Sequence, residues 1–111
     1  MNVTFESLDA ATVVDLFGRL DSANAATVEA ELLSRLSTAP GGVVIDFSRL
    51  DYISSAGLRI ILVIAKRMKQ GARPLVLTGF QPNIRDVFEI SGFLSILEVA
   101  PSRADAVKRV S

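Results

Sequence analysis

Apolar residues recur along the chain in alternating patterns that predict strands followed by helices. Residues 3–8 and 12–17 are rich in β-forming residues and flank the short segment Asp9-Ala10-Ala11, which predicts a hairpin. The next apolar residues repeat at helical spacing, and the capping residues Asp21 and Ser22 precede them: Val28, Leu32, Leu33 and Leu36. We therefore expect a first helix over about residues 22–37.

The middle of the chain predicts a buried strand followed by a second helix. Pro40-Gly41-Gly42 breaks the first helix, and residues 43–47 form a short apolar run typical of a strand that is covered on both faces. Helical spacing then continues as far as Gly71, carried by Leu58, Ile61, Leu62, Ala65 and Met68.

The last third predicts two more strands and two more helices. Residues 74–79 suit a buried strand, and a third helix should run from Pro82 to Gly92. Residues 94–99 suit a last strand, and Ser102 with Asp105 resembles a capping box that opens a helix through Val110. The order ββαβαβαβα predicts one α/β domain over residues 1–111, with a mixed central sheet that is parallel in its later part and flanked by helices.

Composition narrows the possible chemistry. The chain has 111 residues, 50% of them hydrophobic, and its twelve basic and twelve acidic residues cancel, so direct nucleic-acid binding is not expected. It has neither His nor Cys, which excludes imidazole and thiol catalysis, disulfides and the usual zinc sites. We expect no enzymatic activity, no metal and no cofactor.

Hydropathy also argues against export or membrane insertion. The first ten residues, MNVTFESLDA, contain neither a basic start nor a continuous apolar run, so they do not suggest a signal peptide. The most apolar segment, residues 58–65, is far shorter than the ~20 residues that a membrane-spanning helix needs. A cytoplasmic location is the expectation.

Two serines, Ser54 and Ser55, occupy the predicted start of the second helix, just after the central strand. Free backbone N–H groups and the positive end of the helix dipole at such a position would tolerate an added phosphate. A simpler interpretation is that one serine only caps the helix and that Gly57 allows close packing. A serine nucleophile is disfavoured, because the chain has no His and no Gly-x-Ser-x-Gly motif here.

These residues also carry a family resemblance. Asp46-Phe47-Ser48, followed by Tyr52-Ile53-Ser54-Ser55-Ala56-Gly57-Leu58, resembles the signature of bacterial anti-sigma-factor antagonists, which are STAS domain proteins. Gly18-Arg19-Leu20-Asp21 before the first helix and Gly92-Phe93 after the third also match that family. The resemblance implies that Ser55, which precedes Ala56-Gly57-Leu58, is phosphorylated. Several members carry Asp where this chain has Ser54, so Ser54 is the second candidate.

The resemblance further implies a partner-switching cycle. The unphosphorylated chain would bind a serine-kinase anti-sigma factor, phosphorylation of Ser55 would end that binding, and a metal-dependent serine phosphatase would restore the hydroxyl. The alternative, for the same fold, is a scaffold or regulatory subunit of a lipid-transporting ABC complex or an anion transporter, with no phospho-switch.

We expect the partner to contact the start of the second helix and the segment before the first helix. The proposed contact residues are Asp21, Ser54, Ser55, Ala56, Gly57 and Arg59. Asp21 is expected at the same sheet edge as Ser55, although helix capping explains it equally well. Arg59 lies four residues after Ser55 and so shares its helix face, with an ordinary solvated arginine as the alternative.

Several other residues are assigned lesser roles. Asp46 is expected at the end of its strand, bonded to loop N–H groups. Tyr52 and Ile53 should pack in the core or lie at the rim of the contact surface. Gly79, Gln81 and Asn83 form a polar start to the third helix, and we assign no ligand to them.

Overall fold

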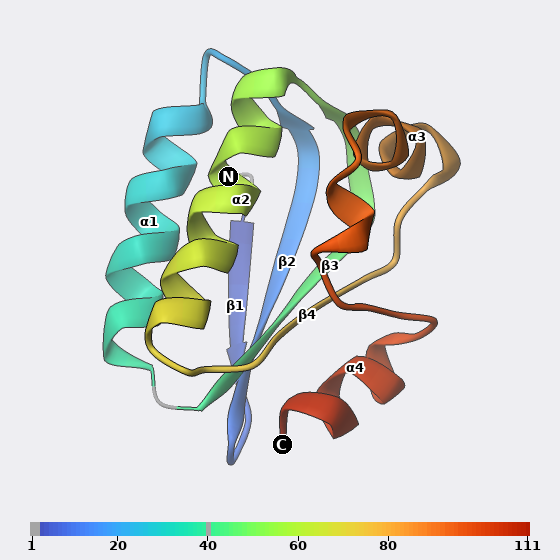
Figure 1. Cartoon of the computed structure of the whole chain (residues 1–111). Coiled ribbons are helices and arrows are strands. Elements are labelled where there is room, and N and C mark those ends of the chain that lie inside the picture. Colours follow the sequence, from blue (N-terminus) through green and yellow to red (C-terminus); the bar gives the residue numbers. More distant parts are fainter. Residues whose placement is uncertain (1–2, 40) are drawn as a thin grey trace.

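The computed structural model describes residues 3–39 and 41–111, which form a five-stranded sheet with helices on both faces (Figure 1). The observed order confirms the predicted ββαβαβαβα pattern, with one added 3₁₀ turn, η1. The elements are β1 Val3–Ser7, β2 Ala11–Leu20, α1 Ala25–Thr38, β3 Gly42–Ile53, α2 Ser55–Gln70, β4 Leu75–Thr78, α3 Pro82–Ser91, η1 Phe93–Ser95, β5 Val99–Ala100 and α4 Arg103–Val110.

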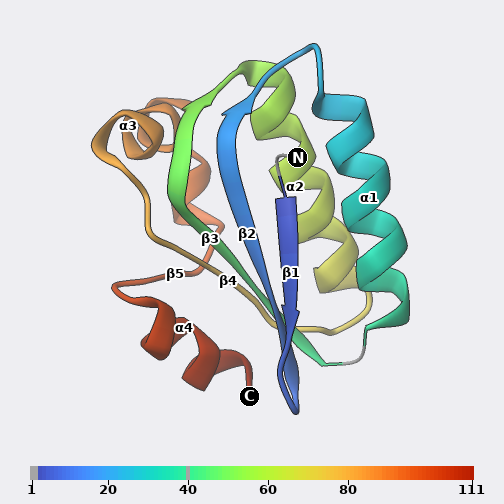
Figure 2. The same cartoon turned by 180° about the vertical axis from the view of Figure 1, so that it is seen from behind.

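The sheet is mixed, as expected, and its strands lie in the order β1-β2-β3-β4-β5. β1 pairs antiparallel with β2 through a tight hairpin, whereas the β2–β3, β3–β4 and β4–β5 pairs are parallel. α1 and α2 lie side by side on one face, and α4 lies on the other (Figures 1 and 2). Helices of the described ranges are all too short or too polar to cross a membrane.

Two hydrophobic cores hold the layers together. The larger lies between the sheet and α1, α2 and α3, and includes the packed aromatic rings of Phe47, Phe80 and Phe88. The smaller lies under α4, where Ala106 and Val110 cover side chains on the opposite face of the sheet: Ala11, Val13, Val44, Val76 and Ala100. The sheet is therefore buried on both faces where α4 covers it, which explains the continuous apolar run of β3.

β3 is much longer than the predicted residues 43–47. Its pairing with β4 ends at Asp46, but its pairing with β2 continues to Ile53. Beyond β4, the side-chain amide of Gln81 donates to the carbonyls of Ser48 at 3.2 Å and Leu50 at 2.8 Å, and the amide of Asn83 donates to the carbonyl of Asp51 at 2.8 Å. The prediction was too short because polar side chains in residues 48–52 interrupt the apolar pattern of the strand. These three carbonyls pair with Gln81 and Asn83 at the start of α3 instead of with a neighbouring strand.

The predicted last strand over residues 94–99 was also wrong. That segment contains η1 and an irregular stretch, and only Val99–Ala100 pairs with β4. Its apolar residues Leu94 and Leu97 pack against the larger core from a loop, so the run reflects burial rather than a strand.

Two earlier elements also differ from their predicted bounds. β2 extends to Leu20 instead of ending at residue 17, and α1 starts at Ala25 after a turn rather than at residue 22.

Candidate functional site

The carboxyl ends of β2 and β3 meet at one edge of the sheet. The backbone N–H of Ser54 donates to the carbonyl of Leu20 at 2.9 Å, and Leu20 pairs with Ile53 in the parallel ladder. Asp21 and Ser54, which directly follow these strand ends, are therefore neighbours in space. The structure places Asp21 at the sheet edge where α2 begins, as the sequence predicted.

Ser54 and Ser55 occupy different positions at the start of α2. Ser54 is the N-cap, in an extended backbone conformation, and its half-buried hydroxyl accepts a hydrogen bond from the N–H of Gly57 at 3.2 Å. Ser55 is the first helical residue and is exposed, and its hydroxyl makes no hydrogen bond within the described part of the chain. Capping thus accounts for Ser54 but not for Ser55.

Gly57 lets the first turn of α2 sit directly on the strand ends. A Cβ added at Gly57 would lie 2.8 Å from the Leu20 carbonyl oxygen and 2.9 Å from side-chain carbons of Leu20 and Ile53. Such distances are shorter than carbon contacts allow, so a side chain here would push the helix away. Gly57 therefore acts through packing, which fixes the height of Ser55 above the sheet.

Asp21 organises the turn that leads into α1. Its Oδ1 accepts from the N–H of Ala23 at 3.0 Å, and its backbone carbonyl accepts from the N–H of Ala25 at 2.9 Å. The N-cap of α1 is Asn24 rather than Asp21 or Ser22, so the capping interpretation of Asp21 was wrong in detail. The other carboxylate oxygen of Asp21 lies 3.7 Å from Nε of Arg19 and is partly exposed to solvent.

An aromatic side chain borders the same edge. The guanidinium of Arg19 lies 4.2 Å from the ring centre of Tyr52, which is 39% exposed, whereas Ile53 is buried. The sequence left open whether each of these two residues packs in the core or lies at the rim of the contact surface. Ile53 belongs to the core, and Tyr52 lies on the surface.

A shallow cleft of about 230 Å³ lies between the first turns of α1 and α2. Ala56 lines this cleft, and so does Arg59, which is exposed on α2. The cleft is otherwise lined by Ser22, Ala25, Ala26, Glu29 and Ile60. Four of these lining side chains are small, those of Ser22, Ala25, Ala26 and Ala56, so the cleft stays open beside the first turn of α2.

A second polar cluster, which the sequence did not predict, lies on the face of the sheet that carries α4. Arg103, the first residue of α4, donates to Asp15 at 2.7 Å, to Asp46 at 3.0 Å and to Glu6 at 3.2 Å. These carboxylates come from β2, β3 and β1, so one arginine links the last helix to three strands. The signal in the sequence was a carboxylate interrupting the apolar pattern of neighbouring strands.

Asp46 does not end its strand, contrary to the prediction, but lies within β3 and is almost fully buried. Its Oδ1 accepts from the N–H of Ser48 at 2.9 Å and from the Ser48 hydroxyl at 2.7 Å. Burial alone would raise the pKa of Asp46, but these bonds and the charge of Arg103 outweigh burial and hold the pKa below its ordinary value. The described side chains form no cluster of His, Cys, Asp and Glu that could hold a metal ion.

Comparison with known proteins identifies the family. BtrV of Bordetella bronchiseptica, a candidate anti-sigma factor antagonist, is 48% identical over 106 residues, which cover 96% of this chain and 91% of BtrV. The anti-sigma-B factor antagonist of Listeria monocytogenes is 31% identical over 103 residues, covering 89% of this chain and 90% of that protein.

Solved structures agree on the fold. The anti-sigma factor antagonist SpoIIAA in its unphosphorylated form is 24% identical, superimposes with a TM-score of 0.80, and covers 96% of this chain and 94% of its own. The phosphorylated form of SpoIIAA, a Bacillus cell fate determinant, is also 24% identical and gives a TM-score of 0.73. The match covers 96% of this chain and 97% of the SpoIIAA chain. The profile of the STAS domain matches residues 2–106, and the chain belongs to the STAS domain family.

Proposed function

We propose that this protein is an anti-sigma-factor antagonist and that Ser55 is its phosphorylation switch. The observation that carries the proposal is the different use of the two serines. The Ser54 hydroxyl is engaged in capping α2, whereas the Ser55 hydroxyl is exposed and accessible to a kinase. The names of BtrV and of the Listeria protein support the antagonist function at 48% and 31% identity.

A phosphate on Ser55 would be compatible with the fold. Ser55 is the first residue of α2, where unpaired N–H groups and the helix dipole favour a negative group, and the first turn of α2 contains no acidic residue. Phosphorylation would therefore add about −1.5 to −2 charges to the surface while the helix stays in place. The signal would be a change of surface charge, with no rearrangement of the domain.

The partner in this proposal is a serine-kinase anti-sigma factor that binds the unphosphorylated chain. The contact surface consists of Asp21, Ser54, Ser55, Ala56, Gly57 and Arg59, among which Ser54 and Gly57 act mainly by positioning the helix. A phosphate at the centre of this surface would have to lose its water shell when the partner binds, and the single neighbouring arginine, Arg59, would offset only part of that cost. A cost of about 3 kcal/mol would weaken binding roughly a hundredfold.

The chemistry of the cycle belongs to the partners. The kinase supplies ATP, magnesium and the catalytic base, and a metal-dependent serine phosphatase removes the phosphate. This chain contributes the accepting hydroxyl and no catalytic group. Because the kinase uses ATP, we place the cycle in the cytoplasm.

The test combines phosphosite mapping with binding. The purified anti-sigma factor and ATP are incubated with wild type, Ser55→Ala and Ser54→Ala, and the products are mapped by mass spectrometry. We expect labelling of wild type and Ser54→Ala but not of Ser55→Ala. Binding of Ser55→Asp, measured by calorimetry, should be about a hundredfold weaker than that of wild type, whereas Ser55→Ala should bind normally.

Each alternative has its own result in these experiments. Labelling that persists in Ser55→Ala and disappears in Ser54→Ala would move the switch to Ser54. Equal affinity of wild type and Ser55→Asp, together with absence of labelling, would favour the scaffold function of a transporter subunit.

A further inference from the structure

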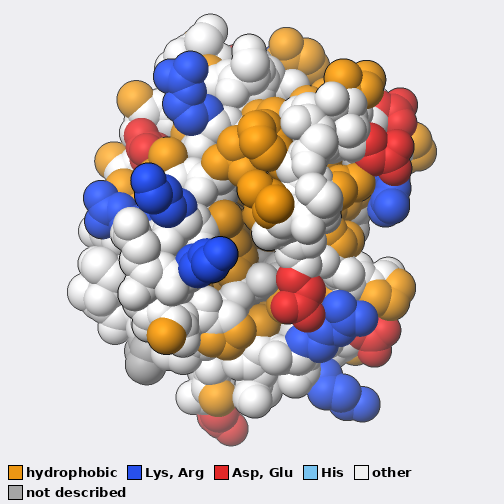
Figure 3. Space-filling model, in the orientation of Figure 1, with side chains coloured by type: hydrophobic (Ala, Val, Ile, Leu, Met, Phe, Trp, Pro, Cys, Tyr) orange, Lys and Arg blue, Asp and Glu red, His pale blue; other side chains and the backbone are white. Residues whose placement is uncertain are grey.

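A groove runs along the end of α2 that is opposite to Ser55. It has a volume of about 380 Å³ and lies between the C-terminal half of α2 and the segment that follows α3. Figure 3 shows hydrophobic side chains gathered in the middle of this face, with Lys and Arg side chains beside them. The groove is lined by Leu62, Ala65, Lys66, Lys69, Phe93, Ile96 and Leu97.

The floor and one wall of the groove are apolar and open to water. Ile96, on the wall opposite α2, is 72% exposed, and Phe93 and Leu97 beside it are only partly buried. A second hollow of about 220 Å³ shares Ile96, Leu97 and Lys69 with the groove and extends it toward β4. Contiguous exposed apolar surface of this kind is typical of a site that binds another molecule.

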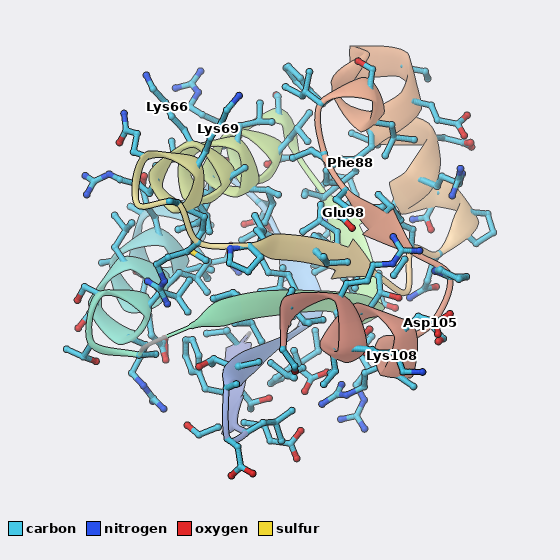
Figure 4. All side chains as sticks on the ribbon, turned by 60° about the horizontal axis from the view of Figure 1, so that its bottom comes forward. Lys66, Lys69, Phe88, Glu98, Asp105 and Lys108 are labelled. Carbon is cyan, nitrogen blue, oxygen red and sulfur yellow. The ribbon has the colours of Figure 1, made fainter. Side chains whose placement is uncertain are left out.

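The α2 wall of the groove is strongly cationic. α2 carries Arg59, Lys66, Arg67 and Lys69 and no acidic residue, although the whole chain has no net charge. Lys66 and Lys69 form no ion pair with described residues, and Figure 4 shows both extending from the helix into open space. Glu98, at the far end of the second hollow, already pairs with Arg109 at 3.3 Å. The positive charge of the groove therefore favours an acidic occupant.

The groove and Ser55 share one face of α2. Steps of four, three, four and three residues along a helix return to the same side, and α2 places an exposed or half-exposed residue at each step. The stripe consists of Ser55, Arg59, Leu62, Lys66 and Lys69. It extends roughly 21 Å at ~1.5 Å per residue, so one elongated element could cover Ser55 and continue into the groove.

From these observations we propose that the groove binds an acidic amphipathic helix of the anti-sigma factor that contacts Ser55. Apolar side chains of that helix pack on Leu62, Phe93 and Ile96, and its carboxylates pair with Lys66 and Lys69. A helix fits better than a strand, because the walls of the groove are a helix and a turn and offer no open sheet edge. This inference rests on the proposed function, since it extends the same interface.

The experiment measures binding of the purified anti-sigma factor to the unphosphorylated chain by calorimetry. We expect Lys66→Glu/Lys69→Glu to weaken binding about tenfold or more, with a smaller salt dependence than wild type. Lys66→Glu alone should weaken binding less than the double variant. Its matched control, Lys108→Glu, makes the same change of charge on α4, which lies on the opposite face of the sheet, and should bind like wild type.

A second pair of variants tests the apolar wall. Ile96→Ser should weaken binding about fivefold, because a contact side chain is lost. Ile90→Ser is its control: Ile90 is 88% exposed on α3 and does not line the groove. Because both isoleucines are exposed, neither substitution should unfold the protein, and equal thermal midpoints would verify this.

The outcomes separate the inference from the function on which it rests. Unchanged affinity of the groove variants, with Ser55→Asp still binding about a hundredfold more weakly than wild type, would overturn the groove proposal and leave the switch intact. If wild type does not bind the anti-sigma factor at all, both fall. Self-association of wild type that Lys66→Glu/Lys69→Glu abolishes would assign the groove to a second copy of the chain and overturn the inference.

Discussion

Ser54 and Gly57 are joined by a hydrogen bond of 3.2 Å from the Gly57 N–H to the Ser54 hydroxyl. This bond uses the hydroxyl of the first serine and leaves the second, Ser55, exposed one residue later. Of the two adjacent serines, only Ser54 is needed by the fold. Stability and phosphorylation should therefore respond to different substitutions.

The first prediction concerns stability. Ser54→Ala should lower the free energy of unfolding by about 1 kcal/mol, because it removes the N-cap of α2. Ser55→Ala should change it by less than about 0.5 kcal/mol, since an exposed hydroxyl without a partner is lost. Urea denaturation of the two variants checks this, and a larger loss for Ser55→Ala would contradict our assignment of the cap.

The second prediction concerns Gly57. Gly57→Ala should destabilise the protein by about 1–3 kcal/mol, because the added Cβ would overlap the Leu20 carbonyl. It should also slow phosphorylation, since the start of α2 moves off the strand ends. The control is Gly71→Ala: the nearest atom to a Cβ there is 3.6 Å away, so its unfolding midpoint should stay close to that of wild type.

Sequence patterns predicted the position of Ser55 well, because the apolar spacing of Leu58, Ile61 and Met68 defines α2 and its start. They could not decide which serine caps the helix, since a one-residue shift of a helix start leaves that spacing unchanged. The hydrogen bond that the Asp21 N–H donates to Oδ1 of Asn24, at 3.0 Å, was also missed. A turn held by short polar side chains has no periodicity to detect.

The third prediction concerns Arg103. Arg103→Met should cost about 2 kcal/mol, because it leaves the buried carboxylate of Asp46 without its cation, although the arginine itself is 40% exposed. Arg109→Met removes only the exposed pair with Glu98 and should cost less than about 0.5 kcal/mol. Urea denaturation of the two variants at neutral pH would measure both losses of stability. Equal effects of the two substitutions would show that the Arg103 cluster contributes no more than a surface ion pair.

The fourth prediction concerns pH. The pKa of Asp46 is lower in the folded protein than its ordinary value of 3.8, so its ionised form favours folding. This contribution is complete above about pH 5 and is lost as the pH falls below about 4 toward the folded-state pKa. Urea midpoints should therefore drop in this acidic range. Asp46→Asn should show a shallower drop, and an equally steep one would assign the acid sensitivity to other carboxylates.

The rest of the fold was predictable to the extent that it follows hydrophobic periodicity. The end of α3 at Gly92 was predicted, and its φ of 81° confirms the left-handed conformation that glycine favours. The Arg103 cluster was not, because its four members come from four elements and meet only after folding. Long-range polar contacts of this kind have no local pattern.

The part of β3 beyond β4 has a consequence for recognition. The amides of Gln81 and Asn83 satisfy three carbonyls of that segment, and β2 holds its other edge, so the strand leading to Ser55 is tied on both sides. A surface held in this way loses little conformational entropy when a partner docks. The protein presents a preformed shape, and any cost of ordering on association falls on the partner.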